Sequence, residues 1–210
     1  MKLYTLTLVA LAGVVGCSSG NESQPGNTAS GTSQPAAQQA EALLGRAAFQ
    51  KTYISARGWQ PDAMPYEEHS QPTKEVPGEG GKAAVWTAGF GSASRGLAKT
   101  FTWSGISAPD APARGMTPSA EDTYNPRNSS TRTFDLAFLK TESDAAYKIA
   151  QEHGGKKLTE KDPKMPIAYR LGWSQRDNTL EWYVMYGGSS DPKLNVAINA
   201  TTGQFVRIEK

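Results

Sequence analysis

The stretch IAYRLGWSQRDNTLEWYVMY, residues 167–186, decides the fold class of this 210-residue chain. Large apolar side chains occupy every second position on both sides of its polar segment SQRDN. Successive side chains of a strand point to opposite faces, so this period predicts two antiparallel strands, each with one buried and one wet face. The residues expected on the buried face are Ile167, Tyr169, Leu171, Trp173, Leu180, Trp182, Val184 and Tyr186.

The same reading predicts the other elements. Period-two segments at 97–103, 133–138 and 194–198 predict further strands, with a turn at 200–203. A helical period predicts a first helix over about 38–56, stopped by Gly58, and a second from Thr141 to the glycines at 154–155. The residues expected on one face of the first helix are Ala40, Leu43, Leu44, Ala47, Ala48 and Ile54. Together these elements indicate an α+β fold.

A weak internal repeat points to two similar units. WTAGFGSASRGL at 86–97 and YRLGWSQRDNTL at 169–180 share an aromatic-x-x-Gly-aromatic motif, six further residues and a leucine. If the repeat is a duplication, each unit is a helix packed on an antiparallel sheet, and Gly89 and Gly172 occupy equivalent positions. The alternative is a chance match between two strand-rich segments. Segment 107–131 contains four prolines and is expected to be an exposed connector.

The last third of the chain resembles a PepSY-type module. SDAAYKIAQEHGG, LEWYVMY and KLNVAINATTGQFV follow the family order of a Gly-ended helix, a W-x-V strand and a strand that runs into a T-G turn. Asn199 stands where the family often has Asp, which weakens the match. The resemblance implies an α+β module of secreted or membrane proteins that binds or restrains peptidases and has no catalytic residues. The matching residues are Ala146, Ala150, Trp182, Val184, Ala200, Thr202, Gly203 and Val206.

The single cysteine lies in LAGVVGCSSGN at 11–21. Lys2 precedes an uncharged apolar run at 3–15, which spans about 20 Å as a helix and is too short for a permanent membrane span. Residues 14–17, VVGC, resemble the lipobox of bacterial lipoproteins. The resemblance implies cleavage before Cys17, acylation of its thiol and anchoring in membrane lipid. The alternative is an ordinary signal peptide with a chance cysteine near its end.

These features predict the organisation and location of the chain. Residues 18–40 contain one charged residue, no aromatic residue and no large aliphatic residue, so they cannot form a core. We expect a signal peptide at 1–16, a lipidated Cys17 with a flexible tether at 17–40, an N-terminal unit at 41–140 and a C-terminal unit at 141–210. The location is then the cell envelope, facing the periplasm or the exterior. Ser18, in place of Asp, favours the outer membrane in a Gram-negative cell.

Composition and motifs point away from catalysis and from nucleic acids. The net charge of +2 becomes +1 once Lys2 is removed with the signal peptide, and a near-neutral surface is untypical of nucleic-acid binding. His69 and His153 are far apart and lack the clustered ligands of a metal site. The adjacent Glu67 and Glu68 would point to opposite faces of a strand. We therefore expect no enzyme activity, no cofactor and no metal.

Three functional hypotheses remain from the sequence. The first is a non-enzymatic binding or peptidase-regulating module whose partner is an envelope or secreted protein. The second is a structural or assembly lipoprotein of an envelope complex, and the third is an enzyme or ligand carrier with an unrecognised site. An edge strand of an antiparallel sheet offers unpaired backbone groups, so an extended partner segment can pair with it without any catalytic residue. Edge pairing is therefore the expected binding mode.

Overall fold

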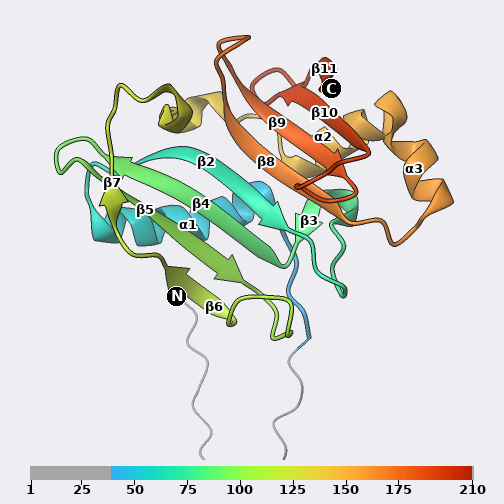
Figure 1. Ribbon diagram of the computed structural model, residues 1–210, viewed down its shortest axis with the longest axis horizontal. Helices are drawn as coiled ribbons and strands as arrows, with labels where there is room; N and C mark the ends of the chain where they lie inside the picture. Colours follow the sequence, from blue (N-terminus) through green and yellow to red (C-terminus); the bar gives the residue numbers. More distant parts are fainter. Residues whose placement is uncertain (1–38, 210) are drawn as a thin grey trace, which may run out of the picture. The chain divides into compact units, whose positions relative to one another are not determined.

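A nine-stranded antiparallel sheet dominates the computed structural model, which describes residues 39–209 (Figure 1). The sheet order is β11-β10-β9-β8-β2-β4-β5-β6, and the short strand β7 also pairs with β5. A separate two-stranded ladder joins β1 to β3. The strands are β1 (Leu43–Leu44), β2 (Met64–Gln71), β3 (Lys82–Ala83), β4 (Val85–Ser92), β5 (Leu97–Ser104), β6 (Gly115–Pro118), β7 (Asp122–Thr123), β8 (Ile167–Ser174), β9 (Thr179–Tyr186), β10 (Leu194–Asn199) and β11 (Phe205–Glu209). The predicted Cys17, signal peptide and most of the tether lie outside the described residues.

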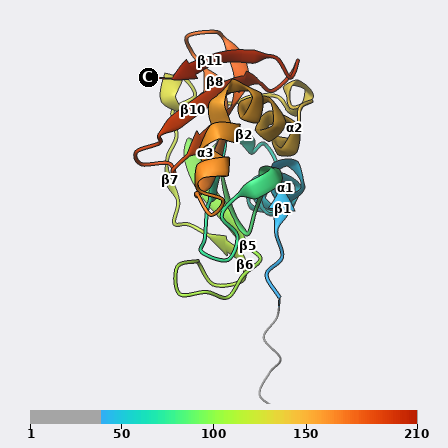
Figure 2. The ribbon, with the colours of Figure 1, turned by 90° about the vertical axis from the view of Figure 1, so that its right-hand side faces the viewer.

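Two helices cover one face of this sheet. They are α1 (Gly45–Trp59) and α2 (Ser143–Ala150), which lie on the same side in the edge-on view (Figure 2). A kinked turn, η4 (Gln151–Gly155), in which His153 and Gly154 leave the helical φ/ψ region, joins α2 to α3 (Lys156–Lys161). The remaining one-turn helices are η1 (Glu79–Gly81), η2 (Ser129–Thr131) and η3 (Leu136–Phe138). The fold is thus mixed α and β, as the sequence predicts, with one large antiparallel sheet and few helices.

The core lies between α1 and the middle of the sheet. Trp86 and Trp182 are fully buried, and their rings meet edge to face with centroids 6.4 Å apart. Gly45, the first residue of α1, lies directly over both rings. A Cβ added to it would lie only 2.6 Å from the Trp182 ring, so the close approach requires glycine. Each indole N–H finds a carbonyl acceptor, on Leu43 for Trp86 and on Thr141 for Trp182. Close packing and satisfied polar groups make this the rigid centre of the fold.

The N-termini of α1 and α2 converge on Glu142 and Ser143. Glu142 Oε1 accepts hydrogen bonds from the backbone N–H of Arg46, at 3.0 Å, and of Ser143, at 2.8 Å. Ser143 Oγ accepts from the N–H of Gly45 at 2.9 Å and donates to the carbonyl of Gly81 at 2.7 Å. A carboxylate stabilises the positive end of a helix. One acidic side chain therefore caps both helices and ties the two halves of the chain together.

The predicted helix boundaries are partly wrong. The first helix begins at Gly45 rather than near residue 38, because Leu43 and Leu44 pair with Ala83 and Lys82 as strands. Of its expected buried face, Ala48 is fully buried, but Ile54 is 73% exposed. The second helix begins at Ser143 rather than at Thr141, and Glu142 is its N-cap. Its predicted end at residues 154–155 is confirmed, because His153 and Gly154 leave the helical φ/ψ region, with Gly154 at a φ of 113°, and the short helix α3 follows this kink.

Two strand predictions also need correction. Residues 133–138 do not form a strand, although Phe134 is buried and packs near Phe49, with ring centroids 6.4 Å apart. Residues 136–138 form the turn η3 instead. The expected connector at 107–131 contains β6 and β7, which pair with β5. The strands predicted at 97–103, 167–186 and 194–198 are present as β5, β8, β9 and β10, and Gly203 takes a positive φ of 72° in the predicted turn.

The two halves of the sheet do not show the predicted residue-for-residue repeat. Strands β2 and β8 pair in the middle of the sheet, and the hairpins β4–β5 and β8–β9 extend from them in opposite directions. The turns are also out of step, since Leu97 pairs with Ser92 at the end of its hairpin, whereas Leu180 lies one position further along and pairs with Trp173. The predicted equivalence at an offset of 83 is therefore wrong at the turn. The described residues belong to one compact unit, and a boundary at 140/141 stays a prediction.

Candidate binding surface

Strand β11 forms one edge of the sheet and is paired on one side only among the described residues. Phe205, Arg207, Ile208 and Glu209 pair with β10. Val206 is an extra residue, because the register shifts between Ala197 and Ile198. Such a bulge bends an edge strand and limits uncontrolled pairing with other edges. The outward-facing N–H and C=O groups of β11 are thus available for pairing with another strand. The bulge limits this pairing to partners that fit the bent strand.

The other edge of the sheet is less suited to pairing. It consists of β6, which ends at Pro118, and the two-residue strand β7. Between them, Ser119 bonds Thr100 through both its backbone N–H and its hydroxyl oxygen, at 2.9 and 3.0 Å. Short strands and proline are common protections for a sheet edge. Of the two edges, β11 has the longer strand, despite its bulge at Val206.

Two apolar side chains of β11 are exposed on the helix-covered side of the sheet. Phe205 is 37% exposed and Ile208 is 48% exposed. The ring of Phe205 stacks on His153 of η4, with centroids 3.7 Å apart and planes 8° from parallel. His153 lies at the kink after α2, where the backbone leaves the helical region. This stack holds one end of β11 against the helical layer.

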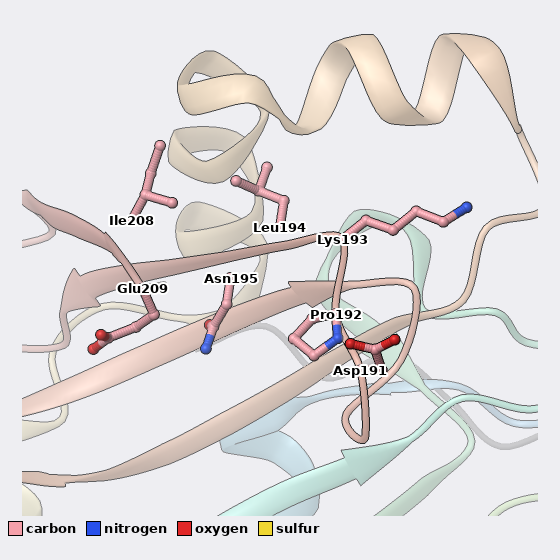
Figure 3. Close-up of a pocket in the computed structure, with 7 residues that line it drawn as sticks. All are labelled: Asp191, Pro192, Lys193, Leu194, Asn195, Ile208 and Glu209. Atoms are coloured by element: carbon pink, nitrogen blue, oxygen red, sulfur yellow. The ribbon is translucent and has the colours of Figure 1, made fainter.

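A cavity of about 380 Å³ lies where β11 ends beside the start of β10 (Figure 3). Figure 3 shows Leu194 and Ile208 pointing toward the helices, while Asn195 and Glu209 point to the other face. The side-chain carbonyl oxygen of Asn195 is buried and has no hydrogen-bond partner among the described residues. The cavity is lined by Asp191, Pro192, Lys193, Leu194, Asn195, Ile208 and Glu209. Its aliphatic wall and charged rim suit one apolar side chain of an extended segment.

On the open face, Arg207 fastens β11 to the body of the sheet. Its guanidinium forms ion pairs with Asp177 and Glu209, and with the fully buried Glu181 at 3.2 Å. Burial lowers the pKa of Arg207, but its hydrogen bonds to Glu209 and Glu181 outweigh burial and raise that pKa above its usual value. Tyr183 donates to Glu181 at 2.8 Å. The edge strand is therefore firmly attached while its outer side stays free.

Of the titratable residues singled out in the sequence, Glu67, Glu68 and His69 lie on β2, far from β11 in the sheet order, whereas His153 contacts β11 through Phe205. Glu67 and His69 are half-buried on the open face, and Glu67 lies 3.9 Å from Arg170. Burial, more than any neighbouring charge, lowers the pKa of His69. Glu68 points to the opposite, helix-covered face, as its adjacency to Glu67 predicts. No group of three or more His, Cys, Asp and Glu residues within 39–209 could hold a metal ion.

Sequence reasoning missed the residues that make this edge distinctive. Phe205 and Ile208 belong to QFVRIE, whose short apolar pattern does not reveal that the strand lies at an edge. The one sequence feature that pointed to β11 was the T-G turn at 200–203, which predicts that the chain ends in a hairpin. Within the described part of the chain, no helix is long and apolar enough to span a membrane.

Comparison with known proteins adds a distant structural similarity. No model of a known protein family matches this chain, and no curated protein matches it. Among solved structures, the chain is similar to a candidate lipoprotein of Clostridium difficile 630, with 11% sequence identity and a TM-score of 0.46. The similarity covers 75% of this chain and 91% of that chain. The resemblances to a lipobox and to a PepSY module therefore rest on the residues quoted above.

Proposed function

We propose that this chain is a lipid-anchored protein of the bacterial cell envelope whose folded part, 41–210, is a non-enzymatic binding module. The anchor is Cys17, acylated after removal of 1–16. The partner is an envelope or secreted protein, with peptidases as the first class to test because of the PepSY resemblance. The observation that carries the proposal is the edge strand β11, unpaired on its outer side among the described residues, with Phe205 exposed at its start and Ile208 exposed at its end, beside a cavity with an aliphatic wall and a charged rim.

Edge pairing explains how such a module binds without catalytic groups. An extended partner segment adds a strand outside β11, and backbone hydrogen bonds supply much of the affinity. Every second side chain of that segment would fall on the side of Ile208 and Leu194, where the cavity selects an apolar residue. Arg207 and Glu209 lie on the other side and favour polar or charged residues there.

The point where the described chain begins is compatible with an anchor. The carbonyl of Gln39 accepts a hydrogen bond from Arg114, and the N–H of Glu41 donates to Gly105. Figures 1 and 2 both place this start away from β11. The first described residues therefore lie clear of the edge strand that we propose as the binding surface.

The anchor is tested by the mass of the mature protein. Intact-mass analysis of the membrane fraction should show a chain that begins at Cys17 and carries acyl groups. Cys17→Ser should leave an unprocessed or soluble protein. A mature chain with a free thiol at position 17 would contradict the anchor.

The binding mode is tested by affinity capture from envelope extract with matched variants. Ile208→Lys and Val206→Pro should each lower recovery of the partner about tenfold or more. Ile54→Lys makes the same change on the exposed side of α1 and should leave recovery unchanged. A captured peptidase that depends on Ile208 supports peptidase regulation, whereas a multisubunit envelope complex supports the assembly alternative. If the amount of captured partner is unchanged by both β11 substitutions, edge pairing is rejected.

A further inference from the structure

The two halves of the sheet are joined by a short ladder to which β2 contributes only titratable residues. Strand β2 pairs with β8 at Glu67, Glu68 and His69, opposite Gly172, Leu171 and Arg170. The ladders β4–β5 and β8–β9, in contrast, run the full length of their strands. We call residues 67–69 and 170–172 the joint. Every residue that β2 contributes to it changes charge within the ordinary pH range.

On the open face, the joint keeps its polar groups in contact with water and with each other. Glu67 lies 3.9 Å from Arg170, and Arg170 in turn lies over the ring of Tyr183 at 5.6 Å. His69 is opposite Arg170 in the ladder. These side chains are half-buried or exposed, so water can solvate Glu67 and His69 in both their charged and their neutral forms.

On the covered face, Glu68 is in a different situation. Its side chain is fully buried, and neither carboxylate oxygen has a hydrogen-bond partner among the described residues. Its ladder neighbours are Ala88 on β4 and Leu171 on β8, which offer no donor from their side chains. A buried carboxylate without partners is strongly disfavoured relative to the neutral acid.

A second negative charge reinforces this preference. Burial, and then the charge of Glu142, raises the pKa of Glu68 well above its usual range. Glu142 itself already caps α1 and α2 through Arg46 and Ser143. Ionisation of Glu68 would therefore place a charge next to both connections between the halves: the β2–β8 ladder and the shared helix cap.

We propose that the joint is a proton-controlled clasp, closed while Glu68 carries a proton and weakened when Glu68 ionises. The folded form binds one proton that the unfolded chain releases above about pH 4.5, the usual value for this carboxyl. Stability from the clasp is thus fully present below that pH and is lost as pH rises through the folded value. His69 acts in the opposite sense, because its lowered pKa removes stability only as pH falls below 6.5.

The test measures urea unfolding of the full-length mature protein in detergent at pH 5 to 9. The variants are Glu68→Gln and Glu68→Met, which remove the ionisable group, and Glu67→Gln, which changes the adjacent residue on the open face. Relative to both Glu68 variants, the wild-type unfolding constant should rise by up to about tenfold per pH unit until the carboxyl has ionised. Glu67→Gln should keep that rise. A constant ratio between wild type and the Glu68 variants overturns the proposal.

Amide hydrogen exchange locates the effect within the sheet. After correction for intrinsic exchange rates, amides of 67–69 and 170–172 should lose more protection between pH 5 and 9 than amides of the β4–β5 and β8–β9 hairpins. Glu68→Gln should abolish this difference. Equal loss of protection in all strands means that no local clasp exists and overturns the proposal, even if overall stability depends on pH.

Discussion

The middle of the sheet and its β11 edge are built in opposite ways. In the middle, Gly45 packs on Trp86 and Trp182, whose rings are fully buried and whose N–H groups are bonded. At the edge, Phe205 and Ile208 remain partly exposed and the outer backbone groups have no partner among the described residues. Stability therefore resides in the middle, and the binding surface that we propose lies at the edge. Substitutions in the two regions should have separable effects.

The largest effect on stability is expected at the start of α1. Gly45→Ala would place a Cβ 2.6 Å from Trp182 and 3.2 Å from Trp86, both held in a packed core. Overpacking of this kind costs about 1–3 kcal/mol. Urea unfolding measures the loss as a lower midpoint with an unchanged slope.

Gly58, in the last turn of the same helix, provides the matched control. Nothing lies within 4 Å of a Cβ added there. Gly58→Ala should therefore stabilise the protein by about 0.5–1 kcal/mol, because alanine favours the helix. Equal changes at both positions would mean that the core beneath Gly45 is looser than the structure shows.

A smaller effect on the global free energy of unfolding is expected where the edge is fastened to the sheet, because the loss there stays local to β11. Arg207→Met removes charged hydrogen bonds from Asp177, Glu181 and Glu209, and should cost about 1.5–3 kcal/mol, mostly as fraying of β11. Hydrogen exchange should show lost protection in β10 and β11 but not in β4. Loss of protection throughout the sheet would show that the edge is not separable from the middle.

The pH dependence of this variant is a further check. Burial alone would raise the pKa of Asp177, but its contacts with Glu181, Ser174 and Arg207 lower it overall from 3.8. The stability that Asp177 contributes is present above about pH 3.8 and is lost as pH falls through the lowered value. Because Arg207 supplies part of this lowering, the difference in stability between wild type and Arg207→Met should shrink as pH falls below 3.8. Parallel curves would contradict the ion-pair network.

The same contrast explains which elements sequence reasoning reached. Strands β8, β9 and β10 alternate between apolar and polar residues, so local pattern suffices to predict them. Strand β2, MPYEEHSQ, was missed because Glu68 occupies a buried position that the pattern reserves for an apolar side chain. Residues 43–44 were assigned to a helix because the strand they pair with, β3, lies about 40 residues later in the chain, and a local pattern does not reveal such a partner.

The candidate site was only partly accessible from sequence. Every open antiparallel sheet has edge strands, so the sequence suffices to expect binding at an edge. Which strands form the edges depends on the strand order, which the sequence does not reveal. That order places β11 outside β10 and brings Ile208 beside Leu194. Cys17, the other site residue, lies outside the described residues, so its acylation stays a prediction.

Site-specific photo-crosslinking in living cells tests the central claim most directly. A photoreactive amino acid is placed at Ile208 on the β11 edge or, as the control, at Ile54 on α1, which is the more exposed of the two at 73% against 48%. The account predicts a discrete crosslink to an envelope or secreted protein from position 208 and none from position 54. A crosslink to that protein from position 54 alone, or from both positions equally, would contradict docking at the β11 edge.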